Sequence, residues 1–150
     1  MSPEIYRVLT ARLAAWVSRQ PNLRALAIVG SWARGNARPE SDLDCIVIAD
    51  EPKGYRGDLG WLATIAFQDA GYRVVSSNCA AYGQVWSWHV GLEPEAEVEI
   101  SFAPPEWASI DPVDAGTERI VKDAFQIVID KNGILEALVA GVAAGRPPSA

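Results

Sequence analysis

Apolar residues spaced three or four positions apart open the chain and predict a helix that runs to about Arg19. The residues on this apolar face are Ile5, Leu9, Leu13, Trp16 and Val17. The preceding Ser2-Pro3-Glu4 is typical of a helix start, because serine caps free N–H groups, proline suits the first helical position and an acid complements the helix dipole. Pro21-Asn22 then breaks the helix.

Short apolar runs bounded by turn residues predict strands further along the chain. The run 43–49 is apolar on both faces, as in a central strand that is covered on both sides. QVWSWHV and AEVEISF alternate apolar and polar residues on either side of the turn-rich GLEPE, which predicts a β-hairpin. The other predicted strands are residues 25–29, 72–76 and 125–129.

Further helices and irregular segments complete the outline. The apolar positions of a second helix, closed by Gly71, are Trp61, Leu62, Ile65 and Ala66. We expect a short helix or turn over 31–36, a structured loop from Trp107 through 111–117, a closing helix from Ile134 to Val142 and a frayed tail, GRPPSA. These elements predict an α+β fold, with a mixed sheet of about four to six strands flanked by helices, in a single domain over residues 1–150.

Composition and charge exclude several kinds of partner and site, although they add little about the fold. The chain has 150 residues, 49% of them hydrophobic, a formal net charge of −6 and a pI of about 4.7. The negative balance makes nucleic acid an unfavourable partner for a broad surface, although a small basic site is compatible with it. No run approaches membrane-spanning length, and Cys45 and Cys79 form no disulfide framework, so we expect a cytoplasmic protein without a membrane partner. A single histidine, His89, excludes a zinc site built from several histidines.

Two carboxylates stand at the entrance of the central strand. Side chains alternate along a strand, so Asp42 and Asp44 point the same way, where unpaired like charges are costly to bury. This arrangement suits a hard divalent cation such as Mg2+. Upstream, Gly30-Ser31 occupies a strand-to-helix turn, where close backbone approach, free N–H groups and a hydroxyl favour phosphate binding. Together these features indicate nucleoside triphosphate chemistry without the Walker pattern GxxxxGK(S/T).

The spacing of these residues resembles the motif of the DNA polymerase β-type nucleotidyltransferase superfamily. The matching residues are Val29-Gly30-Ser31 and, after ten residues, Asp42-Leu43-Asp44-Cys45. The longer string GSWARGNARPESDLD is similar to the small, minimal form of the superfamily, which begins GSxARG, ends SDxD and includes antibiotic-modifying and toxin–antitoxin members. The superfamily carries a third carboxylate on a later strand, and Glu99 in EVEISF matches it, with Glu in place of the commoner Asp.

The resemblance implies a polymerase β palm-like fold and a reaction. The metal-binding and catalytic residues would be Asp42, Asp44 and Glu99, holding two Mg2+ ions or Mn2+. An acceptor hydroxyl, whose proton Glu99 would take, would attack the α-phosphate and displace pyrophosphate. Gly30 and Ser31 would hold the outer phosphates of a nucleoside triphosphate, expected to be ATP, while Arg34 would neutralise charge on the leaving group. The acceptor, a small molecule such as an antibiotic or a protein, is not specified.

Structural roles compete with several of these assignments. The two aspartates could be ordinary strand-entry acids, Ser31 a helix cap and Arg34 a solvated surface residue. Glu97 shares a face with Glu99, and we assign the metal to Glu99 because apolar residues flank it, which leaves Glu97 to solvent. We expect His89 to be packed or half-exposed, because no GxSxG elbow supports a triad with Ser31.

Two other functions are compatible with the sequence. One is an antitoxin-like or regulatory nucleotide-binding module that acts through a partner protein, and the other is an inactive member of the superfamily. Larger members carry an added helical domain that helps to bind the acceptor, so a chain of this length predicts a shallow acceptor site or one completed by a second chain, in a homodimer or with a partner protein. The presence of all three candidate carboxylates favours activity.

Overall fold

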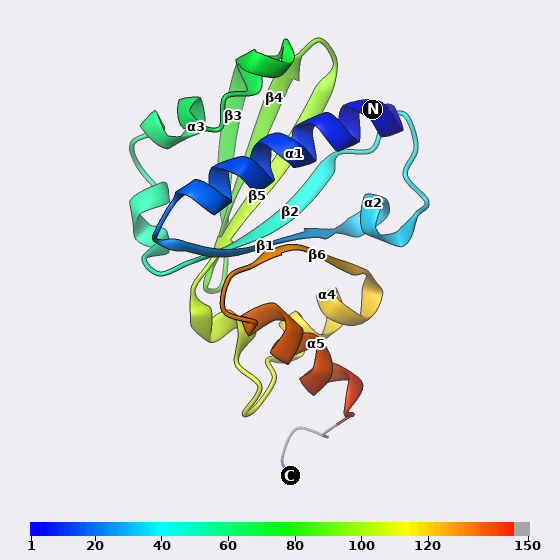
Figure 1. The fold of residues 1–150 in the computed structure, drawn as a ribbon, viewed down its shortest axis with the longest axis vertical. Helices are drawn as coiled ribbons and strands as arrows, with labels where there is room; N and C mark the ends of the chain where they lie inside the picture. Colours follow the sequence, from blue (N-terminus) through cyan, green and yellow to red (C-terminus); the bar gives the residue numbers. More distant parts are fainter. Residues whose placement is uncertain (146–150) are drawn as a thin grey trace.

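A six-stranded mixed sheet forms the centre of the computed structural model, which describes residues 1–145 (Figure 1). The strands lie in the order β3-β4-β5-β2-β1-β6; β2 and β5 run parallel, and every other neighbouring pair is antiparallel. Their bounds are β1 Leu23–Val29, β2 Leu43–Ala49, β3 Arg73–Tyr82, β4 Val85–Glu93, β5 Ala96–Ala103 and β6 Phe125–Asp130. The sheet with its flanking helices confirms the predicted α+β class.

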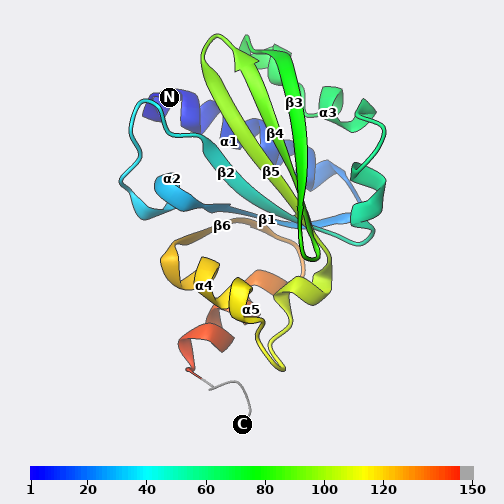
Figure 2. The same ribbon diagram turned by 180° about the vertical axis from the view of Figure 1, so that it is seen from behind.

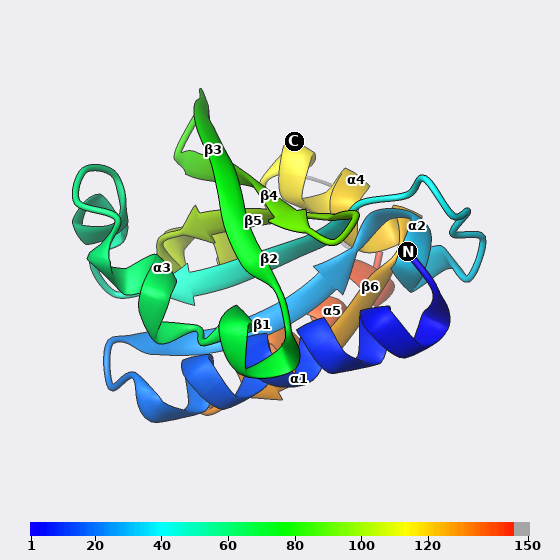
Figure 3. The same cartoon turned by 90° about the horizontal axis from the view of Figure 1, so that it is seen from above.

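Helices cover the two faces of the sheet unequally. Their bounds are α1 Pro3–Arg19, α2 Gly30–Arg34, α3 Gly60–Thr64, α4 Ala115–Asp123 and α5 Ile134–Ala143, with 3-10 turns η1 Pro52–Tyr55, η2 Phe67–Ala70 and η3 Pro105–Ala108. One face is crossed by α1, whereas α4 and α5 lie on the other, near β6 (Figures 1 and 3). Strands β3, β4 and β5 extend beyond α4 and α5 (Figure 2), so part of that second face stays open.

The central strand β2 separates an apolar core from a partly polar face. Its side chains in the core beneath α1 are Leu43, Cys45, Val47 and Ala49. The α1 residues of the same core are Leu9, Leu13, Trp16 and Val17. On the opposite face, Ile46 and Ile48 pack in the smaller core under α5, while Asp44 precedes them on the half-buried part of the strand. This alternation confirms the predicted central strand and places Cys45 in the core, as expected.

The N-terminal helix has the predicted start. The Ser2 side chain accepts a hydrogen bond from the backbone N–H of Ile5 at 3.2 Å, and Pro3 occupies the first turn of α1. The helix ends at Arg19, as the sequence predicts. None of the helices in residues 1–145 is long and apolar enough to cross a membrane.

Three predicted elements differ in the structure. The single helix expected before Gly71 is wrong, because Ala66 adopts a left-handed φ of 63° and divides the segment into α3 and η2. The strand expected over 72–76 continues to Tyr82 as β3, which pairs with β4 along its length. The loop expected over 111–117 instead becomes α4 from Ala115, capped by Asp114. The predicted tail GRPPSA lies outside the described residues from residue 146 onward.

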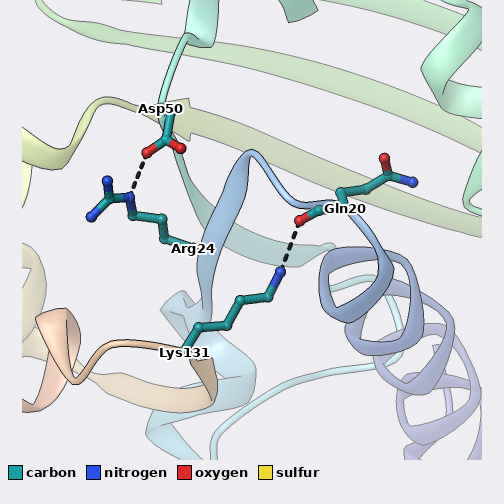
Figure 4. Close-up of polar contacts among 4 residues, drawn as sticks. All are labelled: Gln20, Arg24, Asp50 and Lys131. Carbon is teal, nitrogen blue, oxygen red and sulfur yellow. Dashed lines mark hydrogen bonds and ion pairs between the residues drawn. The ribbon is translucent and has the colours of Figure 1, made fainter.

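Polar contacts fasten the end of the sheet remote from the carboxylates. Arg24 of β1 donates to Asp50, which follows β2, and Lys131 Nζ donates to the Gln20 carbonyl at 2.8 Å (Figure 4). The Lys131 contact places a cation at the carboxyl end of α1, where free carbonyls and the helix dipole favour it. These contacts connect β6, β1, β2 and α1 at one end of the sheet, and Asp42 lies at the opposite end of β2.

Candidate active site

The sheet register gathers a row of polar residues on the face that α4 and α5 leave partly open. Because β2 and β5 run parallel, Asp44 lies directly beside Glu99. The antiparallel strand β4 places His89 on the other side of Glu99, and β3 adds Asn78 beyond it. His89 Nε2 lies 3.5 Å from Glu99 Oε1, and the two side chains are 45% and 24% exposed. His89 is therefore half-exposed, as predicted, and contacts Glu99 rather than forming the head of a serine triad.

A second carboxylate pair lies one step nearer the strand entrance. Asp42 directly precedes β2, and Glu97 stands two residues before Glu99 on β5. A hydrogen bond with Asp42 and the negative charge of Asp42 raise the pKa of Glu97 above its usual range. Glu97 is exposed, as predicted, but its contact with Asp42 is a feature that the sequence did not indicate. Four acids thus occupy two neighbouring steps of the parallel β2–β5 pair.

Among the four acids of this site, Asp44 has the pKa that burial and neighbouring negative charges raise most. The pKa of Asp44 is raised to about 7, first by desolvation and then by the charges of Glu99 and Asp42 and a hydrogen bond with Glu99. His89 partly opposes them. A carboxylate held among other carboxylates gains a proton or a cation to relieve the repulsion. The electrostatics of the row therefore favour a positive ligand at Asp44.

Gly30 brings the backbone against the Asp44 carboxylate. It begins α2 with a left-handed φ of 72°, a conformation that residues with a Cβ rarely adopt. A Cβ built at this position would lie 2.7 Å from Asp44 Oδ2. Ser31 follows in the first turn of α2 and is half-buried. The glycine is required both by its φ and by this close approach.

Arg34 is engaged away from the carboxylate row. Its Nη1 donates to Asp123 Oδ2 of α4 at 2.6 Å, and its Nε donates to Asn36 Oδ1 at 3.3 Å. The ion pair connects the ends of α2 and α4. A role for Arg34 in nucleotide binding stays a prediction, and it would require this pair to open.

A pocket of about 670 Å³ adjoins the row on the side of α4. Asp44 and Glu99 lie at its wall, together with the β3–β4 turn, Trp107 of η3 and one side of α4. Sequence reasoning left Trp107 and the start of α4 without a role, because the sheet register that brings them here is not visible in the local pattern. A larger pocket, about 950 Å³, lies at the start of α1 and is not lined by the carboxylates of the row.

The donor chemistry of the row fits a hard divalent cation. Asp42, Asp44 and Glu99 offer oxygen ligands, which Mg2+ and Mn2+ prefer, and a cation would offset the repulsion that raises the pKa of Asp44. Within residues 1–145, however, no three or more His, Cys, Asp or Glu side chains are already gathered into a metal-binding cluster.

Comparison with known proteins places the fold. The sequence profile described as "Nucleotidyltransferase domain" matches residues 13–129. The structure is similar to an aminoglycoside 6-adenyltransferase from Bacillus subtilis, with a TM-score of 0.50 and 10% identity over 72% of this chain and 37% of that chain. It is also similar to a CCA-adding enzyme from Thermotoga maritima complexed with tRNA, with a TM-score of 0.44 and 16% identity over 92% of this chain and 32% of that chain.

The chain is therefore much shorter than the structures it matches, since it spans 37% and 32% of their lengths. Among curated protein sequences none matches it. The six-stranded sheet and the profile match agree with the resemblance that the spacing of Gly30, Ser31, Asp42 and Asp44 indicated. On these grounds the chain belongs to the nucleotidyltransferase domain family.

Proposed function

We propose that this domain is a Mg2+-dependent nucleotidyltransferase that moves a nucleoside monophosphate from a nucleoside triphosphate to a hydroxyl of an acceptor. The observation that carries the proposal is the register of the parallel pair β2–β5, which puts Glu99 beside Asp44, the residue whose carboxylate Gly30 approaches. The family match supports nucleotidyl transfer in general, and the donor set supports the metal. ATP is the donor that we propose to test first.

Each residue of the proposed site has a separate role in this reaction. Asp42, Asp44 and Glu99 would hold the divalent cation, which when bound neutralises charge on the phosphate oxygens. Glu99 accepts the proton of the acceptor hydroxyl, whose oxygen forms a bond to the α-phosphorus while the bond to the pyrophosphate oxygen breaks. Gly30 gives the outer phosphates access to the backbone, and the Ser31 hydroxyl donates a hydrogen bond to them.

Calorimetry tests the site before any acceptor is known. The intact chain is titrated with a non-hydrolysable ATP analogue, with and without Mg2+. We expect metal-dependent binding that disappears in the double variant Asp42→Asn/Asp44→Asn, because both proposed ligands lose their charge. Asp111→Asn, in an exposed segment outside the row, is the matched control and should bind like the parent. Equal binding by the double variant would disprove the metal site.

A regulatory nucleotide-binding module is the second candidate function. It is favoured by the ion pair between Arg34 and Asp123, which engages the basic residue proposed for nucleotide binding away from the carboxylates. Such a module would bind the analogue but transfer no nucleotide, alone or as a homodimer, until a partner protein is added. The single-domain organisation and the cytoplasmic location expected from the sequence stay predictions.

A further inference from the structure

The sheet ends on one side at β3, which pairs with β4 alone (Figure 2). Eight of the ten residues of β3 are exposed. The strand at the opposite edge, β6, is shorter, and most of its residues are half-buried beside α1, α4 and α5. The outer side of β3 therefore presents a row of backbone N–H and C=O groups that no other strand of residues 1–145 pairs.

The sequence of β3 lacks the residues that usually protect an edge strand. Charged side chains, lysine above all, and proline discourage a second strand from pairing. The nine residues 74–82, VVSSNCAAY, contain neither, although 21% of the chain is charged. Five large apolar side chains are exposed in residues 1–145, and three of them, Val74, Val75 and Tyr82, belong to β3. An exposed and uncharged edge of this kind favours pairing with another strand.

A bulge limits the part of β3 that another strand can join. The register between β3 and β4 shifts between Val74 and Ser76, so Val75 has no partner on β4. From Ser76 to Tyr82 the register is continuous. Cys79 is the middle residue of this regular segment, 76–82, and it is exposed.

We propose that the segment 76–82 pairs antiparallel with the same segment of a second copy of this chain, about a twofold axis at Cys79. The charges favour this partner. Each copy has a net charge of −6, so two copies repel one another in general, but along 76–82 they can meet without placing like charges opposite each other. A charged partner strand would find no opposite charge on this segment. Each copy has one such edge, so the pairing closes at two copies and leaves neither edge free.

The position of the axis fixes which residues of the two copies meet. Cys79 lies opposite Cys79 of the second copy. The neighbouring pairs are Asn78 with Ala80 and Ser77 with Ala81. These side chains are small and uncharged, and directly opposed Cβ atoms lie about 4.5–5.5 Å apart. Opposed residues share a face of the joined sheet, so the carboxylate rows of both copies lie on the same side. Pairing of this kind does not require the proposed nucleotidyltransferase function.

Cross-linking of the parent chain tests this register. Cys45 is buried, so Cys79 is the thiol that a maleimide reaches in the native chain. The control is the double variant Val8→Cys/Cys79→Ser, which carries its exposed thiol on α1 instead. We expect a short bismaleimide to join two parent chains at least about tenfold faster than two control chains, because pairing raises the effective concentration of the opposed thiols. Equal rates would reflect random collision and would overturn the pairing.

Sedimentation velocity measures the association itself. We expect the intact chain to form a dimer at about 100 µM, in a fraction that falls on dilution, because a single pair of short strands is a small interface. Cys79→Lys should be a monomer at the same concentration, since it places two like charges together at the axis. Cys79→Ser, which adds no charge, should remain a dimer. Val8→Lys adds the same charge at an exposed position of α1 and should also remain a dimer.

Three results would overturn the pairing of two copies through β3. They are a parent chain that stays monomeric at about 100 µM, a dimer that persists in Cys79→Lys, and assemblies larger than a dimer. A monomeric parent would leave the edge to a different protein. Circular dichroism verifies that the variants fold, and if Cys79→Lys does not fold, the cross-linking rates of the parent and control chains decide. Nucleotide binding enters none of these measurements, so the proposed function stands or falls separately.

Discussion

At the level of single residues, the acids of the row are distinguished by their neighbours rather than by their own chemistry. Glu97 and Glu99 are identical side chains two positions apart on β5, yet Glu99 lies beside Asp44 and His89 while Glu97 contacts Asp42 near the exposed end of the strand. The sequence alone favoured Glu99 through its apolar neighbours. The sheet register supports the same choice, because it places Glu99 rather than Glu97 beside Asp44.

Exchange of each glutamate for glutamine separates their roles. Glu99→Gln should lower the single-turnover rate of nucleotidyl transfer by about 100-fold or more, because it removes the proposed proton acceptor and one metal ligand. Glu97→Gln should change that rate by less than about tenfold, because Glu97 is exposed and Glu99, not Glu97, lies beside Asp44. A dead Glu97→Gln variant beside an active Glu99→Gln variant would show that the third ligand is misassigned.

The stability of the metal-free protein should depend on the proton at Asp44. The pKa of Asp44 is about 7 in the folded state and about 3.9 in an unfolded chain, so folding binds a proton between these values. Its stabilising effect is complete below about pH 4 and is lost as the pH rises through about 7. Relative to the parent, the free energy of unfolding of Asp44→Asn should therefore increase from about pH 5 to about pH 8. Urea titrations without metal measure it, and a constant difference would show that Asp44 carries no such shift.

Gly30 offers a matched test of close approach. Gly30→Ala and Gly35→Ala both place a Cβ at a left-handed φ, 72° and 77°, so each should cost about 1–2 kcal/mol of stability. Only at Gly30 would the new Cβ meet Asp44, since nothing lies within 4 Å at Gly35. We expect analogue binding, measured by calorimetry, to be lost in Gly30→Ala and kept in Gly35→Ala. Equal binding by both variants would mean that the approach of Gly30 to Asp44 is not needed for the nucleotide.

At the level of elements, α4 is the part of the site that the sequence did not predict. Asp114 and Thr117 form a good helix start, but the turn-rich residues before them led to a predicted loop. The helix is also only nine residues long and carries Gly116 in its first turn, so a sequence pattern alone distinguishes it poorly from a loop. By contrast, β2 was predicted with the bounds it has, because its continuous apolar run is decided by burial on both faces.

The N-cap and the ion pair of α4 should contribute different amounts to the free energy of unfolding. Asp114→Ala removes a side chain that accepts from the Thr117 N–H, and it should lower the free energy of unfolding by about 1 kcal/mol. Arg34→Gln breaks a pair whose side chains are 38% and 51% exposed, and the cost should stay below about 1 kcal/mol because solvent screens it. Urea unfolding of both variants compares them, and a larger loss in Arg34→Gln would mark the pair as the main anchor of α4.

At the scale of the whole molecule, sequence reasoning predicted the fold class and the central strand, both of which depend on local pattern, while its assignment of the acids to a metal stays a prediction. It did not find the pairing of Asp42 with Glu97, the contact of His89 with Glu99, or the pocket under α4. The first and the third depend on elements that are distant in sequence and adjacent in space, and the second depends on the exact register of the β4–β5 hairpin, which the predicted turn did not specify. Such neighbours follow from topology, which a single sequence leaves undetermined.

Ligand binding should stabilise the whole fold only when the acids are intact. A ligand that binds the native state raises stability by an amount set by its concentration relative to Kd, about 2.7 kcal/mol at a hundredfold excess over Kd. Mg2+ with the ATP analogue should therefore raise the Tm of the parent chain, and Asp44→Asn should abolish the rise without lowering the Tm of the metal-free protein. Thermal melts with and without both ligands test this; a rise that persists in Asp44→Asn would remove Asp44 from the site.

The alternation of β5 has a consequence for how this domain tolerates change. Val98, Ile100 and Phe102 fill the core beneath α1, while Glu97, Glu99 and Ser101 face the other way. A slip of one residue would carry the acids into that core and the apolar side chains out to water. Packing of the buried side chains of β5 therefore fixes the positions of Glu97, Glu99 and Ser101 on its other face. Substitutions that loosen the core should therefore lower the rate of nucleotidyl transfer before they unfold the protein, because they disturb the register that places Glu99 beside Asp44.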